Sequence, residues 1–143
     1  MPNHPIPSPA PRFILYQDVH SRIALHVRFD GDDVWLTQPQ IALLFHTTRE
    51  NVNQHIRNIY QKAELQKERT CKKFLHVQNE GRRTVQRNIT HYGMDMIVAV
   101  GYRVKSSAAT QFRQWATERR KQIVVEKKQR EVIIVSTEKN QQK

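Results

Sequence analysis

The sequence predicts an α+β fold: a winged-helix-like helix-turn-helix domain with an N-terminal β-hairpin, a basic β-hairpin as the wing and a C-terminal helix. Three observations lead to this prediction. Two neighbouring segments with helical spacing of apolar residues are separated by only a few residues. Segments on both sides of that pair alternate apolar and polar residues and are bounded by glycine-containing turns. A further segment with helical spacing follows near the C-terminus.

The N-terminal hairpin is predicted from two apolar segments rich in β-branched residues, FILYQ (13–17) and IALHVRF (23–29). Asp30 and Gly31 supply the next turn, and Val34 to Leu36 form a short third strand.

The first helix of the helix-turn-helix is predicted to begin after Thr37. Thr37 and Gln40 have the spacing of a capping box, and Pro39 lies in the first turn, where a missing N–H costs little. The residues at helical spacing behind them form one apolar face: Ile41, Ala42, Leu44 and Phe45.

The second helix is predicted to begin with another capping box, Thr47 with Glu50. Its apolar stripe consists of Val52, Ile56, Ile59 and Tyr60. Two short helices with so short a break must cross at a large angle, which favours a helix-turn-helix. The turn contains His46 where glycine is usual, so the turn must form with less backbone freedom.

The exposed face of this second helix is rich in side chains that read bases. Arginine suits guanine, and asparagine or glutamine suits adenine. The predicted contacts to bases or phosphates are Arg49, Asn53, Gln54 and Arg57. Two amphipathic helices that simply pack in a small domain would give a similar stripe, but the polar face favours DNA binding.

A second hairpin is predicted from TCKKFLHVQ (70–78) and TVQRNITHY (84–92), which flank a turn containing Gly81. Its basic side chains would contact phosphates as the wing of the domain: Lys72, Lys73, Arg82, Arg83 and Arg87. A charged hairpin tip that serves only solubility explains the same residues equally well.

The C-terminal part is predicted to hold two helices. DMIVAV (95–100) forms a short apolar helix that ends at Gly101, and Ser106 or Ser107 caps the final helix. The large side chains expected in the core are Phe45, Ile56, Phe112 and Trp115.

The chain is expected to comprise three parts. Residues 1–12 hold most of the prolines and are expected to be a disordered leader. The domain would span 13–117, and 118–143 would be a charged C-terminal extension. Within the extension EVIIVS (131–136) is compatible with a strand, with the end of the helix or with a segment that binds a partner, and periodicity does not choose among them.

The composition favours a polyanionic partner. Lys and Arg number 24 against 13 acids, a net charge of +11, which suits DNA, RNA or an anionic membrane surface. No apolar run reaches the roughly 18 residues of a spanning helix, and residues 1–13 lack the pattern of a signal peptide. The single cysteine, Cys71, cannot form an internal disulfide. We therefore expect a cytoplasmic protein without a membrane partner.

Four segments of the chain resemble the virulence-associated RhuM family of bacterial proteins: VWLTQPQIALLF (34–45), RENVNQHIRNIY (49–60), CKKFLHV (71–77) and VGYRVKSSAATQFRQWAT (100–117). The last segment also resembles, faintly, a helix of phage antirepressor Bro-N domains. The resemblance implies a DNA-binding-like module of mobile elements or pathogenicity islands, with no catalytic residues to carry over. Family members continue with a second helical region, whereas the similarity of this sequence to the family is expected to end after Thr117. We therefore expect a truncated copy.

No pattern in the sequence predicts an enzyme. The seven histidines include no HExxH pair, Cys71 has no CxxC companion, and no glycine-rich phosphate loop is present. We expect no metal and no cofactor. Two hypotheses remain: a transcription regulator that binds double-stranded DNA, and an antirepressor-like module. The latter would bind another regulator, or a second copy of itself, through Phe112, Trp115 and residues 131–136.

Overall fold

The computed structural model describes residues 12–18, 22–31 and 33–141, with side chains placed as far as residue 129 except at residue 127. The expected leader therefore lies outside the described residues, apart from Arg12. The elements are β1 (Arg12–Asp18), β2 (Ile23–Asp30), β3 (Asp33–Leu36), α1 (Gln38–Leu44), α2 (Arg49–Gln61), α3 (Lys67–Thr70), β4 (Cys71–Glu80), β5 (Arg83–Gly93), α4 (Met94–Arg103) and α5 (Ala108–Gln141). The predicted α+β class is confirmed.

The strands form one antiparallel sheet in the order β1-β2-β3-β5-β4. Both predicted hairpins are present, and the short β3 joins them by pairing with the end of β5, where Trp35 lies opposite Gly93. A β-carbon on Gly93 would lie 2.8 Å from Asp33 Oδ2 and 3.4 Å from Trp35 Cζ3, so glycine permits this close approach.

The core lies between one face of the sheet and the helices. Along β2 buried and less buried residues alternate, as expected for a strand with one covered face. Tyr16 of β1 and Phe29 of β2 meet Trp115 of α5 with ring centroids 5.0 and 5.8 Å away. Phe112 packs edge-on against Tyr16 at 5.3 Å. These aromatic contacts hold the first turns of α5 against the N-terminal hairpin.

The four large side chains expected in the core have two kinds of environment. Phe45, Ile56 and Phe112 are buried, which confirms the prediction for them, whereas Trp115 is half-buried at the edge of the aromatic cluster. Phe112 has no exposed surface and packs on Tyr16, so it belongs to the interior of the fold.

The two short helices α1 and α2 follow each other as predicted, but the second cap differs by one residue. Thr37 caps α1 in a complete capping box with Gln40. The prediction that Thr47 caps α2 is wrong, because the hydroxyl of Thr48 accepts the hydrogen bond from the backbone N–H of Asn51. Thr47 instead accepts a hydrogen bond from the side-chain amide of Asn51. Between the helices His46 adopts φ of +53°, the left-handed conformation that glycine usually supplies.

Gly101 does not end the helix as predicted; it lies inside α4, which continues to Arg103. A β-carbon at this position would lie 2.5 Å from Ala109 Cβ and 2.9 Å from Phe45 Cζ. The glycine therefore allows α4 and α5 to pack closely. The turn between them uses Lys105 at φ of +53°, and the hydroxyl of Ser106 accepts from the N–H of Ala108 at the start of α5.

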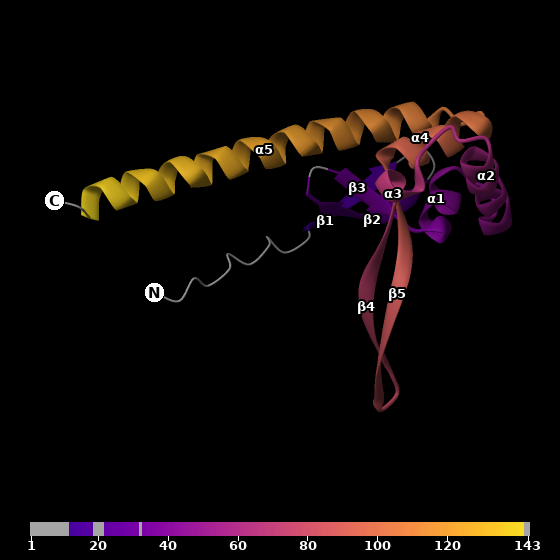
Figure 1. Cartoon of the computed structure of the whole chain (residues 1–143), viewed down its shortest axis with the longest axis horizontal. Helices are drawn as coiled ribbons and strands as arrows, with labels where there is room; N and C mark the ends of the chain where they lie inside the picture. The colour runs from indigo at the N-terminus through magenta and orange to yellow at the C-terminus, as the bar shows by residue number, and fades with distance from the viewer. Residues whose placement is uncertain (1–11, 19–21, 32, 142–143) are drawn as a thin grey trace.

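The last helix, α5, runs over 34 residues and passes the expected boundary at residue 117 without interruption. Residues 131–136 belong to it, which selects the helical alternative among the three considered. Figure 1 shows α5 running along one side of the body and extending beyond it, while the β4–β5 hairpin projects from the other side. No helix in the described part of the chain is long and apolar enough to cross a membrane.

We expect Gly101→Ala to lower the free energy of unfolding by about 1–3 kcal/mol, because the added methyl overpacks the contact with Ala109 and Phe45. Alanine in a helix is otherwise favoured over glycine by up to about 1 kcal/mol, so the direction is diagnostic. Urea denaturation measures the change. The double variant Gly101→Ala/Ala109→Gly restores space at the crossing, and the two substitutions should not be additive. A Gly101→Ala protein more stable than the original would contradict the close packing.

Candidate nucleic-acid interface

The outward stripe of α2 carries three of the predicted contact residues. Arg49, Asn53 and Arg57 are spaced four residues apart and therefore lie on one face of the helix. The two arginines are exposed, whereas Asn53 is half-buried. Gln54 is exposed beside this stripe, and its amide nitrogen lies 3.5 Å from Asn58 Oδ1.

Asn53 is connected to the base of the β4–β5 hairpin through Gln38. The Nε2 of Gln38, in the first turn of α1, donates to Asn53 Oδ1 at 3.2 Å and to the hydroxyl of Tyr92 at 3.2 Å. Tyr92 belongs to β5 and is buried, and burial raises the pKa of its phenol. Because Asn53 lies between Arg49 and Arg57 on the helix, the bridge links the middle of the stripe to the base of the hairpin.

Nothing in the sequence singled out Gln38 as a functional residue. It follows the cap residue of α1, a position at which many polar residues occur. Its role depends on the contact between α1 and β5, which brings together residues more than 50 positions apart. A pattern limited to neighbouring residues contains no signal for it.

The hairpin is a long arm of ten- and eleven-residue strands closed by a two-residue turn at Gly81 and Arg82. Gly81 has φ of +63°, which fits the first position of a type II′ turn. Apart from the part nearest the body, most of its side chains are exposed. The arm carries five basic residues against a single acid, Glu80.

The structure does not bring the five predicted wing residues to one face of the arm. Neighbouring residues of a strand point to opposite faces, so Lys72 and Lys73 are separated. Cross-strand partners share a face, so Arg87 lies opposite His76 on the side of Lys72. The resulting distribution is Lys72, Arg83 and Arg87 on one face, Lys73 on the other, and Arg82 in the turn.

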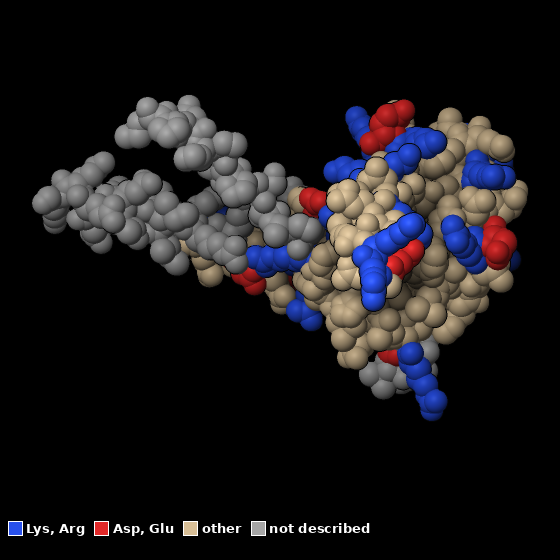
Figure 2. Space-filling model, turned by 90° about the horizontal axis from the view of Figure 1, so that it is seen from below, with Lys and Arg blue, Asp and Glu red and all other residues tan. Residues whose placement is uncertain are grey.

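Two of these basic groups have partners within the fold. The ammonium of Lys72 lies 4.9 Å from the centre of the Trp35 ring, and the guanidinium of Arg87 forms an ion pair with Glu80 at 3.1 Å. Seen along the arm from its tip, the basic side chains form separate groups spread over the surface and outnumber the acidic ones (Figure 2). The positive field is therefore distributed rather than concentrated in one patch.

The base of the arm is anchored by a cluster of rings and one arginine. Arg28 of β2 lies 3.8 Å over the ring of Phe74, and Phe74 packs edge-on against Trp35 and His91. His91 is buried, stacks on His76 at 5.3 Å and has its Nδ1 2.9 Å from the carbonyl oxygen of Ile89. Burial lowers the pKa of His91 and outweighs the contact with the Ile89 carbonyl, which raises it; the neighbouring His76 and Arg28 also lower this pKa.

The Cys71 thiol and the Asp33 carboxyl both have a pKa that is raised by burial. In the described part of the chain, no three His, Cys, Asp or Glu side chains are placed to hold a metal ion. Burial raises the pKa of Cys71 despite the nearby Lys67 and Lys73, so its thiol is a poor nucleophile at neutral pH. Asp33 is buried enough for its pKa to be raised, but its Oδ1 accepts from the N–H groups of Val34 and Met94, a structural role at the start of α4.

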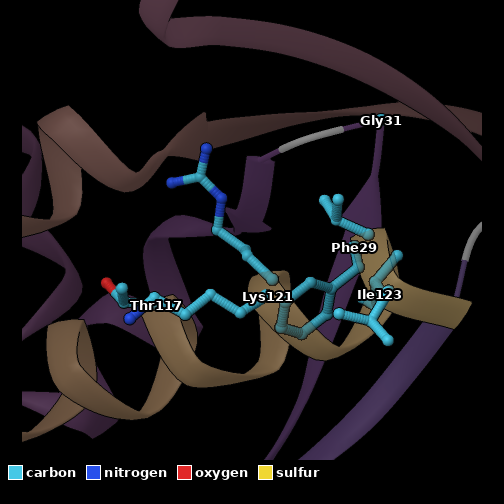
Figure 3. Close-up of a pocket in the computed structure, with 8 residues that line it drawn as sticks. Phe29, Gly31, Thr117, Lys121 and Ile123 are labelled. Carbon is cyan, nitrogen blue, oxygen red and sulfur yellow. The ribbon is translucent and has the colours of Figure 1, made fainter. Parts of the chain in front are cut away.

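A groove of about 600 Å³ lies beside α5 (Figure 3). Phe29 of β2 and Ile123 of α5 lie side by side in it, and Val124 and Val125 on the same stretch of α5 are largely exposed. Its remaining lining residues are Gly31, Thr117, Arg120 and Lys121. The surface is apolar with a basic rim.

Residues 69–129 match the model of the Virulence protein RhuM family. The expected RhuM resemblance is thereby confirmed from the end of α3, through the hairpin and α4, into α5. The match continues to residue 129, so the expected departure from the family after Thr117 is wrong. The helices α1 and α2 precede the RhuM match. No significant match to a curated protein or to a solved structure was found.

We expect the protein to lose stability as the pH falls below about 6.5, the ordinary imidazole pKa. The pKa of His91 is lowered in the fold, so the unfolded chain takes up the proton first. The contribution of neutral His91 is complete above that pH and decreases until the pH reaches the lower pKa of the folded state. Denaturation at a series of pH values measures the slope.

The variant His91→Phe keeps a ring against Phe74 and should flatten this slope. The matched control His46→Gln changes an exposed histidine in the turn before α2 and should retain the slope. An unchanged slope in His91→Phe would show that His91 is not the group responsible.

Proposed function

We propose that this protein binds double-stranded DNA and regulates transcription of a bacterial mobile element or pathogenicity island. The observation that supports DNA binding most strongly is the Gln38 bridge, because it joins the polar stripe of α2 to the base of a basic arm. A helix and an arm that are linked at the base of the arm can contact the same duplex. The regulatory role rests on the RhuM match and on the mobile-element setting that the resemblance implies.

In this proposal α2 lies in the major groove. Its arginines Arg49 and Arg57 flank Asn53, so guanine or phosphate contacts would surround a contact to adenine. The carbonyl oxygen of Asn53 accepts from Gln38, which fixes the plane of the amide before DNA binds. Gln54, one residue further, adds a second amide on the exposed side.

The arm would contribute contacts to phosphates. Arg82 in the turn and Arg83 beside it lie farthest from the body and are exposed. Lys73 lies on the arm face that continues toward Tyr92 and hence toward α2. The surplus of basic residues over the whole chain, a net charge of +11, would increase the association rate with any duplex.

The groove beside α5 supports a second candidate function, an antirepressor-like module that binds another regulator or a second copy of this chain. The aromatic residues first considered for this role are engaged in the fold: Phe112 is buried, and Trp115 packs on Tyr16 and Phe29. The exposed Val124 and Val125 are the better candidates. Duplex binding that weakens steeply with salt supports the first function, and salt-insensitive binding to a protein supports the second.

Arg57→Ala and Gln54→Ala should each weaken binding to a preferred duplex by about 1–3 kcal/mol while the melting temperature stays unchanged, because both side chains are exposed. Fluorescence anisotropy on a duplex selected from random sequences measures the loss. Lys128→Ala removes an exposed residue of α5 and serves as the control, with little effect expected. If Arg57→Ala binds as tightly as the original protein, α2 does not read the DNA.

Replacing Arg82 and Arg83 together by alanine should weaken binding to all duplexes by a similar factor, because phosphates carry no sequence information. The slope of log affinity against log salt should fall by roughly 2, about one unit for each lost phosphate contact. Anisotropy titrations at several salt concentrations give the slope. Lys121→Ala/Lys128→Ala removes two charges from α5 and should leave it unchanged. An unaltered slope in the arm variant would mean that the tip serves solubility alone.

A further inference from the structure

The arm has one face with almost no charge, and this face is not covered by the body. Leu75 and Val77 point outward on β4 with 54% and 58% of their surface exposed. Their partners across the hairpin are Asn88 and Gln86, so two aliphatic and two amide side chains share this face. We call these four residues the ribbon face.

The opposite face of the arm is used differently. Near the body it packs on the cluster around Trp35 and Arg28, and toward the tip it carries the ion pair between Arg87 and Glu80. The arm is therefore anchored by one face and leaves the ribbon face open along its length. Two exposed aliphatic side chains on the same face of a projecting arm form a small apolar patch that a partner can cover.

We propose that the ribbon face lies in the major groove of the duplex and contacts base edges there. This inference rests on the DNA binding proposed above and assigns to the arm a role in sequence reading beyond the phosphate contacts of its tip. Asparagine and glutamine pair with the hydrogen-bonding edge of adenine, and aliphatic side chains contact the methyl group of thymine. The ribbon face thus carries the side chains that suit A·T pairs.

Charge identifies the partner as a polyanion. The arm has five basic residues and one acid, and that acid, Glu80, lies on the opposite face. The nearest charge on the same side as the ribbon face is Lys73, two residues from Leu75 toward the body. A face without acids between basic flanks is compatible with the floor of a groove lined by phosphates.

Shape and position agree with this partner. A two-stranded ribbon fits the major groove, and a ten-residue strand spans about 34 Å, close to one turn of B-DNA. Tyr92 lies on the same side of the hairpin as the ribbon face, at its base, and is joined through Gln38 to Asn53. The ribbon face therefore lies on the side of the arm that is linked to α2 at its base.

The test uses the full chain and duplex sites selected from random sequences. We expect Gln86→Ala/Asn88→Ala to lose the preference for A·T pairs at some positions of the DNA site. These positions should differ from those at which Arg57→Ala changes the preference. Affinity for the preferred duplex should fall at least about fivefold, the factor that corresponds to 1 kcal/mol at tenfold per 1.4 kcal/mol. Affinity for random duplexes should stay unchanged. The matched control Gln78→Ala removes an exposed amide from the opposite face and should leave both affinities intact.

A second measurement locates the groove. Replacing thymine by uracil at the positions read by the arm removes only the methyl group, which lies in the major groove. The original protein should bind the uracil duplex more weakly, whereas Leu75→Ser/Val77→Ser should bind both duplexes equally. Circular dichroism confirms that each variant is folded.

Each other result overturns the inference in a recognisable way. If Gln86→Ala/Asn88→Ala selects the same sites as the original protein, the arm does not read bases, and the DNA binding proposed above is unaffected. Equal weakening on every duplex assigns the ribbon face to phosphate contacts. If Gln78→Ala loses as much affinity as Gln86→Ala/Asn88→Ala, the loss reflects a general effect on stability and not base reading. If the original protein binds no duplex at all, both proposals fail together.

Discussion

The structure depends on a very short contact, the pairing of β3 with the end of β5. Only Trp35 with Gly93 and Leu36 with Tyr92 are paired, yet this contact joins two hairpins that are far apart in the sequence into one sheet. Because α1 follows β3 and α4 follows β5, the same contact also decides where both helices begin. Gly93 makes it possible, since a larger residue would collide with the carboxylate of Asp33. That carboxylate in turn accepts from the first N–H of α4, so sheet pairing and helix start are mutually dependent.

Local patterns predicted the elements well and their packing poorly. The capping box at Thr37 and the alternation in both hairpins depend on residues a few positions apart, and the structure confirms them. The role of Gly101 depends on Ala109 and Phe45, which belong to other elements. The prediction that this glycine ends a helix was therefore wrong, because it considered only the neighbouring residues. The shift of the α2 cap from Thr47 to Thr48 reflects two adjacent residues of equal capping ability, between which the wider fold decides.

The candidate site was predictable to a similar degree. The polar stripe of α2 follows from helical spacing, and the basic arm follows from alternation and charge. Alternation also implies that Lys72 and Lys73 point to opposite faces of the strand, so the five basic residues of the arm cannot form a single basic surface. The Gln38 bridge and the anchor of Arg28 on Phe74 required the tertiary structure, because each connects elements that are distant in the chain.

The uninterrupted helix α5 has a geometric consequence of its own. Its first turns are fixed to the sheet by Phe112 and Trp115, and from there the helix advances about 1.5 Å for each residue. Successive residues are also rotated by about 100° around its axis. The continuous helix therefore sets both the distance and the angle of residues 131–136 relative to the arm. Inserting or deleting one residue between Trp115 and this segment would rotate the segment to a different side of the molecule, although the amino-acid composition of the helix would hardly change.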